Sequence, residues 1–331
     1  MVENKGRWLS SFSTCLLVLI FSSFAYDAES QVRFSDVVIP PSLEQPVGMI
    51  ETVAEDDSYA AKYLPDIIYA TYGKRAVTLS LLIPKQESAK RSWPLIVYVQ
   101  GAAWRNQNLY QALPQLADFA HQGYVVASIE HRPSSEVIAP AQVQDIKSAI
   151  RYLRKNAEKY YIDPNRIGIM GDSSGGHLAV MVGVSDGVAD FETEDNQPFS
   201  SSVKAVVDLY GPTDFLQMHK YPSRIDHNAE DSPESLVVGG PIQDPKYRAL
   251  VDLYNPLTYI EKDKKLPPFF IIHGDTDALV PFNQSVLLYT RLRDTNHEVA
   301  FYKIKGAGHG PGIWTKGVMD RIQEFFDQKL K

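Results

Sequence analysis

Cysteine is almost absent from this chain of 331 residues, whose single cysteine is Cys15. Cys15 lies within an apolar run near the N-terminus, so removal of that run would leave a mature protein without any thiol. Such a protein has no thiolate nucleophile and no cysteine ligand for zinc or for an iron–sulfur cluster. A chain of this length can bury enough apolar surface to fold outside the cytoplasm without disulfides.

Basic residues are outnumbered by acidic ones. The chain has 33 lysines and arginines against 40 aspartates and glutamates, which gives a formal net charge of −7. No segment gathers positive charge, so we expect no nucleic-acid partner. Hydrophobic residues make up 44% of the chain and charged residues 22%, a balance that indicates a globular protein with a sizeable core.

No apolar run near the N-terminus is long enough for a comfortable membrane span, which needs roughly 20 apolar residues. The run Cys15–Phe21 follows the basic residues Lys5 and Arg7 and precedes small residues that end at Ala25. This layout is typical of a secretory signal peptide. We therefore predict a signal peptide over residues 1–25, cleaved near Ala25, a secreted or periplasmic location, and no stable membrane span after cleavage. An uncleaved anchor is the alternative.

The rest of the chain alternates strand-like and helix-like patterns after a polar, proline-bearing arm at residues 26–64. Continuous or alternating apolar runs of strand length occur at Arg75–Ile83, Leu95–Val99, Tyr124–Ile129, Arg166–Met170, Val203–Leu209, Pro268–His273 and Glu298–Ile304. Amphipathic helical patterns cover Ala141–Tyr160 and Ile313–Leu330. The alternation predicts an α/β domain over residues 65–331, with helices on both faces of a mostly parallel central sheet. Functional loops should then follow the carboxyl ends of strands.

A serine stands at one of these strand ends. The stretch RIGIMGDSSGGHLAV, Arg166–Val180, places Ser173 in a G-x-S-x-G pattern directly after a strand-like run. Glycines permit the tight turn of a nucleophile elbow, and the helix that follows directs its N–H groups at developing negative charge. A second match, Gly183–Gly187, follows helical residues, and we interpret it as a helix end. A plain strand-to-helix turn is the alternative for Ser173.

Aspartate and histidine follow two later strands. Pro268–His273 leads into Asp275 and Asp277, and Glu298–Ile304 leads into a glycine-rich loop that carries His309. Serine, acid and histidine thus occur in the chain order of an α/β-hydrolase, in which histidine activates the serine and the acid orients the histidine. The loop GAGHGPG also resembles a dinucleotide-binding loop, but Pro311 replaces its third glycine and too little chain follows for a β-α-β unit.

Other polar residues are given structural roles. We expect His177 and His273 to be packed and hydrogen-bonded, and Asp145 to be a structural partner for a loop or an arginine. Glu130, His131 and Arg132 follow a strand and are expected to brace a loop, with lining of the site as the alternative. Three histidines follow no strand and are predicted to lie in solvent: His219, His227 and His297. Residues 212–266 form a polar insertion, for which a surface excursion and a small lid or pocket wall are equally supported.

Five stretches carry a family resemblance: IVYVQGAAW, AQVQDIKSAIRYLRKNAEKYYIDPNRIGIMGDSSGGHLA, SPESLVVGGP, PPFFIIHGDTDALVP and GAGHG. They resemble α/β-hydrolases of the hormone-sensitive-lipase-like group, and most of all the secreted acetyl and feruloyl esterases of BD-FAE type. The resemblance implies an α/β-hydrolase fold and ester hydrolysis by Ser173, His309 and an acid, without metal or cofactor. Its pattern assigns the acid to Asp277 and leaves Asp275 to bond N–H groups of the turn.

The resemblance also locates the donors for the oxyanion. They are the N–H of Ser174, after the serine, and those of a loop that reads Gln100-Gly101-Ala102-Ala103-Trp104 in place of HGGGW. We expect the N–H groups of Ala102 and Ala103 to serve if both residues have negative φ, because alanine at positive φ is strained by about 1–2 kcal/mol. Trp104 is predicted to contact the substrate.

The sequence therefore predicts a serine carboxylesterase that acts on small-molecule or carbohydrate esters, with short acyl, acetyl or feruloyl groups. Two alternatives stay open. The same residues can cleave amides or peptides, as in a formamidase or an exopeptidase, since the fold does not select the bond. The Ala102-Ala103 departure also allows a catalytically weak hydrolase fold that serves in binding.

Overall fold

The computed structural model describes residues 38–53, 60–85 and 92–331. The chain divides into two units, residues 1–54 and residues 55–331. Residues 38–53 of the first unit contain no helix or strand, and all of them are exposed. The predicted signal peptide, its cleavage near Ala25 and the first part of the predicted arm lie outside the described residues.

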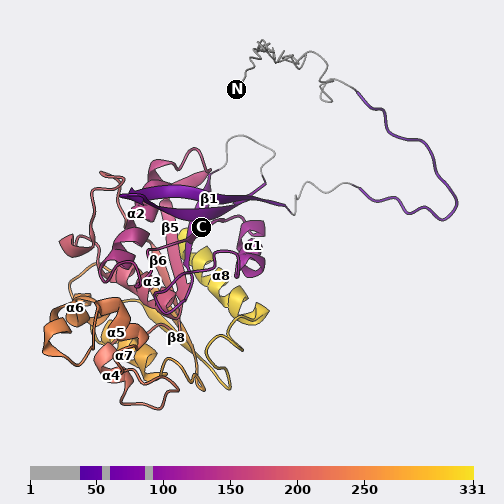
Figure 1. Ribbon diagram of the computed structural model, residues 1–331. Coiled ribbons are helices and arrows are strands. Elements are labelled where there is room, and N and C mark those ends of the chain that lie inside the picture. The colour runs from indigo at the N-terminus through magenta and orange to yellow at the C-terminus, as the bar shows by residue number, and fades with distance from the viewer. Residues whose placement is uncertain (1–37, 54–59, 86–91) are drawn as a thin grey trace, which may run out of the picture. The chain divides into compact units, whose positions relative to one another are not determined.

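The second unit is built on one eight-stranded sheet (Figure 1). Its strands are β1 (Ala61–Tyr72), β2 (Arg75–Pro84), β3 (Trp93–Val99), β4 (Val125–Ile129), β5 (Ile162–Asp172), β6 (Ala205–Leu209), β7 (Phe269–Gly274) and β8 (Val299–Ile304). They lie in the order β1-β2-β4-β3-β5-β6-β7-β8. Strand β2 is antiparallel to β1 and to β4, and every other neighbouring pair is parallel. The mostly parallel sheet predicted from the apolar runs is confirmed.

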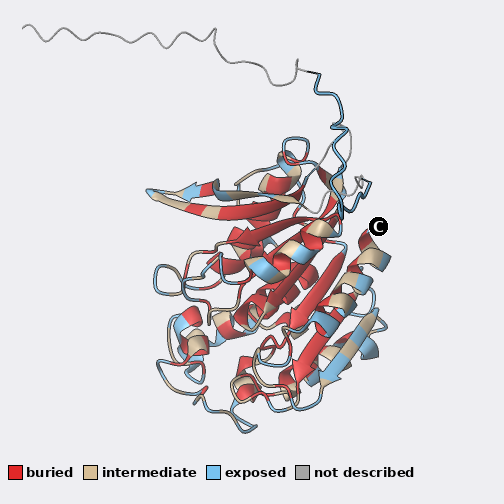
Figure 2. Cartoon of the chain, turned by 90° about the vertical axis from the view of Figure 1, so that its right-hand side faces the viewer, coloured by how far each residue is buried: buried red, intermediate tan, exposed pale blue. Residues whose placement is uncertain are grey.

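Helices cover both faces of this sheet. They are α1 (Leu113–His121), α2 (Ala141–Lys155), α3 (Ser174–Val184), α4 (Phe215–Met218), α5 (Pro233–Val238), α6 (Arg248–Leu253), α7 (Asn283–Asp294) and α8 (Lys316–Leu330), with 3-10 turns η3 (Ala189–Phe191), η4 (Pro245–Tyr247) and η5 (Pro256–Tyr259). Helices α1 and α8 bury their apolar stripes in one hydrophobic core, and α2, α3 and α7 bury theirs in another. The buried layers lie on either side of the sheet (Figure 2).

Three inner strands are buried along their whole length, as continuous apolar runs in a doubly covered parallel sheet should be. Every residue of β4, β6 and β7 is buried. Edge strand β8 contains only intermediate and exposed residues instead. This contrast follows from position, because an edge strand is covered less completely than a central one.

The first strand was not expected. β1 begins at Ala61, within the segment interpreted as part of the N-terminal arm, so the sheet starts before the predicted boundary at residue 65. Its register against β2 shifts between Leu64 and Ile67 and again between Ile68 and Ala70. These irregularities break the two-residue alternation that marks a strand in a sequence, so the sequence of β1 indicates irregular chain instead of a strand.

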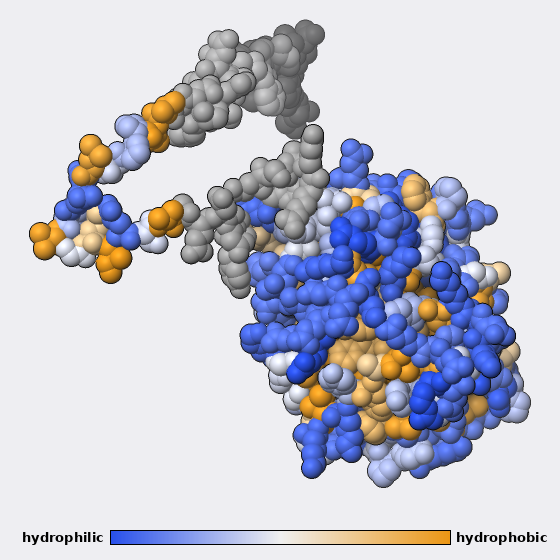
Figure 3. Space-filling view, turned by 180° about the vertical axis from the view of Figure 1, so that it is seen from behind, coloured by the Kyte–Doolittle hydropathy of each residue, from blue (hydrophilic) through white to orange (hydrophobic). Residues whose placement is uncertain are grey.

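The outer surface of the second unit is mostly hydrophilic. Hydrophilic residues cover most of the second unit in Figure 3, and hydrophobic residues gather in one area of its lower half. Among the described residues, no helix combines the length and the apolarity needed to cross a membrane.

Strand β6 carries a buried carboxyl group. The side chain of Asp208 is 1% exposed, and its Oδ1 accepts a hydrogen bond from the N–H of Gly211 at 2.9 Å. Its Oδ2 has no hydrogen-bond partner among the described residues. Burial raises the pKa of Asp208 to about 7, against the smaller opposing effect of the Gly211 N–H.

We expect the Asp208→Asn variant to gain stability over the wild type as pH rises. A carboxyl whose pKa is raised on folding stabilises the folded state fully at pH below its unfolded pKa of 3.8, and this contribution is lost as pH rises towards about 7. A shift of this size is worth up to about 4 kcal/mol. Urea unfolding at pH 4.5 and pH 8 measures the difference, with exposed Asp263→Asn as the control. The prediction would be contradicted if the free energies of unfolding of variant and wild type differed by the same amount at both pH values.

Candidate active site

Ser173 lies at the corner between β5 and α3, where the sequence predicted it. Its backbone has φ 52° and ψ −126°, and its N–H donates to the carbonyl of Leu209 at 2.8 Å. Non-glycine residues rarely adopt such a conformation, and it persists only where surrounding structure enforces it. A strained backbone at a residue with a reactive side chain is a recurrent feature of functional sites.

The neighbouring glycines are required by close packing of the corner. A methyl group on Gly171 would overlap the carbonyl of Gly175, and one on Gly175 would overlap the carbonyl of Val99. Both obstacles are backbone atoms, which cannot move aside as a flexible side chain can. The G-x-S-x-G spacing therefore reflects how tightly α3 begins against β3 and β5.

Ser173, His309 and Asp277 are joined by hydrogen bonds, and we call them the trio. The Nε2 atom of His309 lies 2.9 Å from Ser173 Oγ, and its Nδ1 lies 2.8 Å from Asp277 Oδ2. Asp277 follows β7 and His309 follows β8, so all three residues stand at the carboxyl ends of parallel strands. The structure brings together the three residues that the sequence selected.

Asp277 is held by four hydrogen bonds in all. Its Oδ1 accepts the N–H groups of Leu279 at 2.8 Å and Val280 at 3.0 Å, and its Oδ2 also lies 3.1 Å from His273 Nε2. Burial alone would raise the pKa of this carboxyl, but the hydrogen bonds from His273 and His309 outweigh it. They hold the pKa of Asp277 well below its usual range.

The neighbouring polar residues have supporting positions. Asp275 Oδ1 accepts the N–H of Gly306 at 2.6 Å and so links the two loops that carry the trio's acid and imidazole. His273 Nε2 also lies 3.1 Å from the carbonyl of Val280, and its Nδ1 lies 2.8 Å from Ser285 Oγ. A second imidazole on the acid was not predicted, because only a general structural role was expected of His273.

The loop after β3 differs from the expectation. Ala103 has φ 53° and Trp104 has φ 54°, within a turn closed by a 2.9 Å hydrogen bond from Arg105 N–H to Ala102 O. Positive φ at both central residues is the pattern of a type I′ turn, which glycine and asparagine favour. The negative φ on which we expected the Ala103 donor to depend is therefore absent, and alanine there is strained by about 1–2 kcal/mol.

The N–H of Ala102 is also engaged in a hydrogen bond within the protein. It donates to Ser174 Oγ at 3.0 Å, and the N–H of Gly101 donates to Asp172 Oδ1 at 3.0 Å. The Ser174 hydroxyl therefore occupies the Ala102 N–H in this conformation, and the role of Ala102 as an oxyanion donor stays a prediction. The Ser174 N–H stands at the first residue of α3, where helix geometry supplies no acceptor. Ala103 lines the pocket, and no hydrogen bond within the described residues engages its N–H, so the N–H groups of Ala103 and Ser174 stay candidate donors despite the positive φ of Ala103.

Side chains behind this loop hold it in place. Gln100 Oε1 accepts the N–H of Asn108 at 2.6 Å, and its Nε2 donates to Gln111 at 2.9 Å, so it holds the loop in place. Arg132 pairs with buried Asp145 at 2.7 Å, which confirms the bracing role expected of both residues. Two residues further along the chain from Arg132, the N–H of Ser134 donates to the carbonyl of Trp104 at 2.8 Å.

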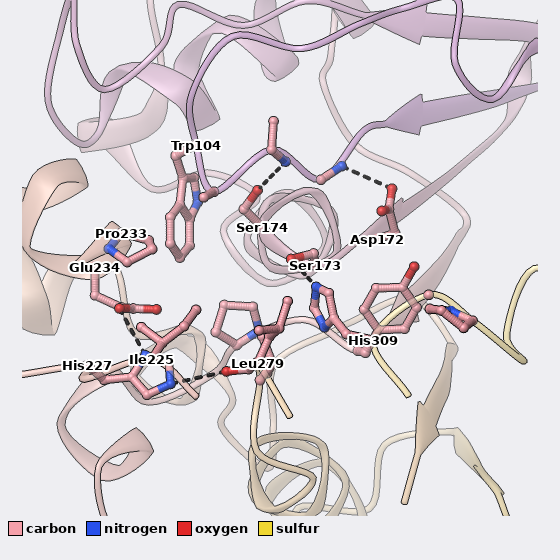
Figure 4. Close-up of a pocket in the computed structure, with 18 of the residues that line it drawn as sticks. Trp104, Asp172, Ser173, Ser174, Ile225, His227, Pro233, Glu234, Leu279 and His309 are labelled. Carbon is pink, nitrogen blue, oxygen red and sulfur yellow. Dashed lines mark hydrogen bonds and ion pairs between the residues drawn. The ribbon is translucent and has the colours of Figure 1, made fainter. Parts of the chain in front are cut away.

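A pocket of about 490 Å³ includes Ser173 and His309 in its lining (Figure 4). Its other lining residues include Trp104, Ile225, His227, Pro233, Glu234, Leu279, Val280 and Trp314. Four of these come from the segment 212–266, so part of that insertion forms a wall of the pocket. Trp104 lines the pocket with an indole that is 1% exposed and packs edge-on against His177 and Phe215.

One residue of the insertion differs from the sequence interpretation. His227 was predicted to lie in solvent, but it is 1% exposed and bonded to Glu234. The prediction was wrong because this partner lies in α5, a helix of six residues that is too short to show a pattern in the sequence. Tyr254 of the same insertion is fully buried in the core beside His177, whose Nε2 bonds its carbonyl at 2.8 Å.

A strained serine at a strand–helix corner, bonded to a histidine from the end of the same sheet, defines the α/β-hydrolase class. Among the described residues, no group of three or more acidic, histidine or cysteine side chains is placed to hold a metal ion. The family model BD-FAE matches residues 79–292, which is more than half of the chain. The protein therefore belongs to the BD-FAE family of α/β-hydrolase esterases.

Known proteins agree with this assignment. A truncated carbohydrate esterase from gut microbiota is 34% identical, over 83% of this chain and 98% of that one, with a TM-score of 0.72. A bifunctional GH43-CE protein from Bacteroides eggerthii is 32% identical, over 81% of this chain and 35% of that one, with a TM-score of 0.73. Esterase LipC of Mycobacterium tuberculosis is 29% identical over 72% of this chain. The chain spans 58% of LipC and 53% of the related LipM, so it covers about half the length of these relatives.

Proposed function

We propose that this protein is a serine carboxylesterase whose trio of Ser173, His309 and Asp277 is catalytic. The observation that carries the proposal is the 2.9 Å contact between His309 Nε2 and Ser173 Oγ, with Asp277 2.8 Å from the other ring nitrogen. This geometry supports general-base activation of the hydroxyl. It also weighs against a silent binding protein, since the reacting groups are already within hydrogen-bond reach.

The reaction follows from these contacts. Ser173 Oγ attacks the ester carbonyl carbon while His309 Nε2 takes the hydroxyl proton, and the ionised Asp277 stabilises the resulting imidazolium. The carbon–oxygen bond to the alcohol then breaks as His309 returns the proton to the leaving oxygen. Water repeats the two steps on the acyl-enzyme and releases the acid. The N–H groups of Ser174 and Ala103 would stabilise the oxyanion.

The proposed substrates are acetyl or other short acyl esters of carbohydrates, with feruloyl esters as a second acyl class. The support is the relation to a carbohydrate esterase at 34% identity and a pocket of about 490 Å³, which suits a small ester. Trp104 is proposed to form the pocket wall beside the acyl or alcohol group. Secretion is proposed from the N-terminal sequence, and it fits an enzyme whose substrate is extracellular polymer.

The function is tested with purified protein on matched substrates. p-Nitrophenyl acetate, butyrate and octanoate, acetylated xylan and a feruloyl ester measure acyl preference, and p-nitroacetanilide measures amide cleavage. We expect kcat/KM to be highest for acetyl esters and to fall with chain length, with the anilide far slower. Faster hydrolysis of the anilide than of the acetate would favour an amidase, the alternative that the same trio allows.

A further inference from the structure

The pocket wall contains a buried acid–imidazole pair that the proposed mechanism does not use. Glu234 is 3% exposed and His227 1% exposed, and Glu234 Oε2 lies 3.1 Å from His227 Nδ1. Glu234 sits in the first turn of α5, which Ser232 caps by accepting the N–H of Ser235. Both members of the pair line the pocket that holds Ser173, among apolar neighbours such as Ile225 and Leu279.

The hydrogen bonds of His227 hold both of its ring nitrogens in place. Its Nε2 lies 3.1 Å from the carbonyl of Leu279 and 3.1 Å from Ser223 Oγ, and its Nδ1 lies 3.1 Å from Glu234 Oε2. The imidazole is thereby fixed against the carboxyl group and orients it within the pocket wall.

The other carboxyl oxygen of Glu234 is free. Among the described residues no hydrogen bond reaches Glu234 Oε1, while Oε2 is held by His227. Figure 4 shows the carboxyl group between His227 and the pocket interior, on the side of Trp104. A rigidly held acceptor in an apolar wall is the arrangement by which pockets select a polar group of a ligand.

We propose that Glu234, oriented by His227, accepts a hydrogen bond from a ring hydroxyl of the substrate and so selects esters of sugars over esters of the same shape without hydroxyls. This inference rests on the proposed esterase function. A site built to bond a substrate hydroxyl discriminates strongly against the analogue without it, because its buried acceptor is then left unpaired. Selection by apolar walls alone is much weaker.

The test compares two esters with a six-membered ring in the alcohol: a monoacetylated methyl β-D-xylopyranoside and cyclohexyl acetate. We expect the wild-type kcat/KM to be at least about tenfold higher for the glycoside. Glu234→Met should lower it about 10- to 100-fold for the glycoside, the range for a hydrogen bond to a charged or strongly polar group. The loss for cyclohexyl acetate should be at least tenfold smaller. Glu234→Gln keeps the shape and a polar group, so its kcat/KM for the glycoside should lie between those of the wild type and the Glu234→Met variant.

Glu230→Gln is the matched control, because Glu230 is an exposed glutamate of the same insertion. It should leave the selectivity ratio between the two esters at the wild-type value. Parallel losses on both esters in the Glu234→Gln and Glu234→Met variants would overturn this proposal and reduce the pair to a structural role, with esterase function intact. Absence of any Ser173-dependent turnover by the wild type would instead overturn the proposed function, and this proposal with it.

Discussion

Replacing Ser173 by alanine is expected to lower kcat for p-nitrophenyl acetate by about 10⁴- to 10⁶-fold, as loss of the nucleophile does in other serine hydrolases. The physical reason is that, in the part of the chain that the structure describes, no other hydroxyl is bonded to His309 Nε2, which lies 2.9 Å from Ser173 Oγ. Initial rates, with active-site titration by a phosphonate ester, measure the loss. The variant should neither turn over the ester nor incorporate the phosphonate.

The first control for this prediction is a check that the variant is folded. Thermal unfolding should show the Ser173→Ala protein intact, since alanine keeps the backbone of the corner and removes only a hydroxyl. Ser135→Ala, at an exposed serine outside the pocket, should keep full activity. Ester turnover that survives in the Ser173→Ala variant would assign the nucleophile to another residue.

The second large effect is expected for Asp277→Asn, with kcat about 10³- to 10⁴-fold lower. Oδ1 of Asp277 accepts two backbone N–H groups, so the asparagine oxygen must face them and its NH₂ must face the imidazoles. His309 would then accept at Nδ1 and carry its hydrogen on Nε2, where it cannot take the proton of Ser173. Steady-state kinetics measure the loss, and Asp275→Asn at the same turn should lose less than about tenfold.

The pH dependence separates the members of the trio. Asp277 has a pKa held well below the usual range, so it stays ionised as pH falls through the range in which the imidazole gains its proton. A group with a lowered folded pKa stabilises the protein above its unfolded pKa and loses that contribution only in strong acid. The acid limb of kcat/KM should therefore report His309. An acid limb that persists unchanged in a variant without His309 would contradict the assignment.

The fold was predictable wherever burial left a simple pattern. The doubly covered strands β3, β4, β6 and β7 appear in the sequence as apolar runs, and α8 as a stripe that includes Ile322 and Phe326. Strand β1 was missed because its register shifts destroy the alternation. Helix α2 ends at Lys155, before the predicted Tyr160, since an amphipathic stripe does not mark where hydrogen bonding stops.

The site was predictable as residue identities and not as backbone geometry. Serine, acid and histidine follow strands in a fixed order, and that order is visible in the sequence. The positive φ of Ala103 is imposed by the surrounding loop, and the hydrogen bond from Ala102 to Ser174 Oγ joins residues far apart in the chain. Likewise, nothing local indicates that His227 and Glu234 meet inside the pocket.

The two hydrogen bonds that flank the nucleophile have a consequence for engineering and for divergence of the family. The side chains of Asp172 and Ser174, the immediate neighbours of Ser173, each accept a hydrogen bond from one N–H of the loop after β3. The loop after β3 and the corner that carries Ser173 therefore depend on each other, and an exchange of one requires an exchange of the other. A graft of a glycine-rich loop from another hydrolase should be designed with the residues on both sides of the serine, or the transplanted segment will lack its anchors.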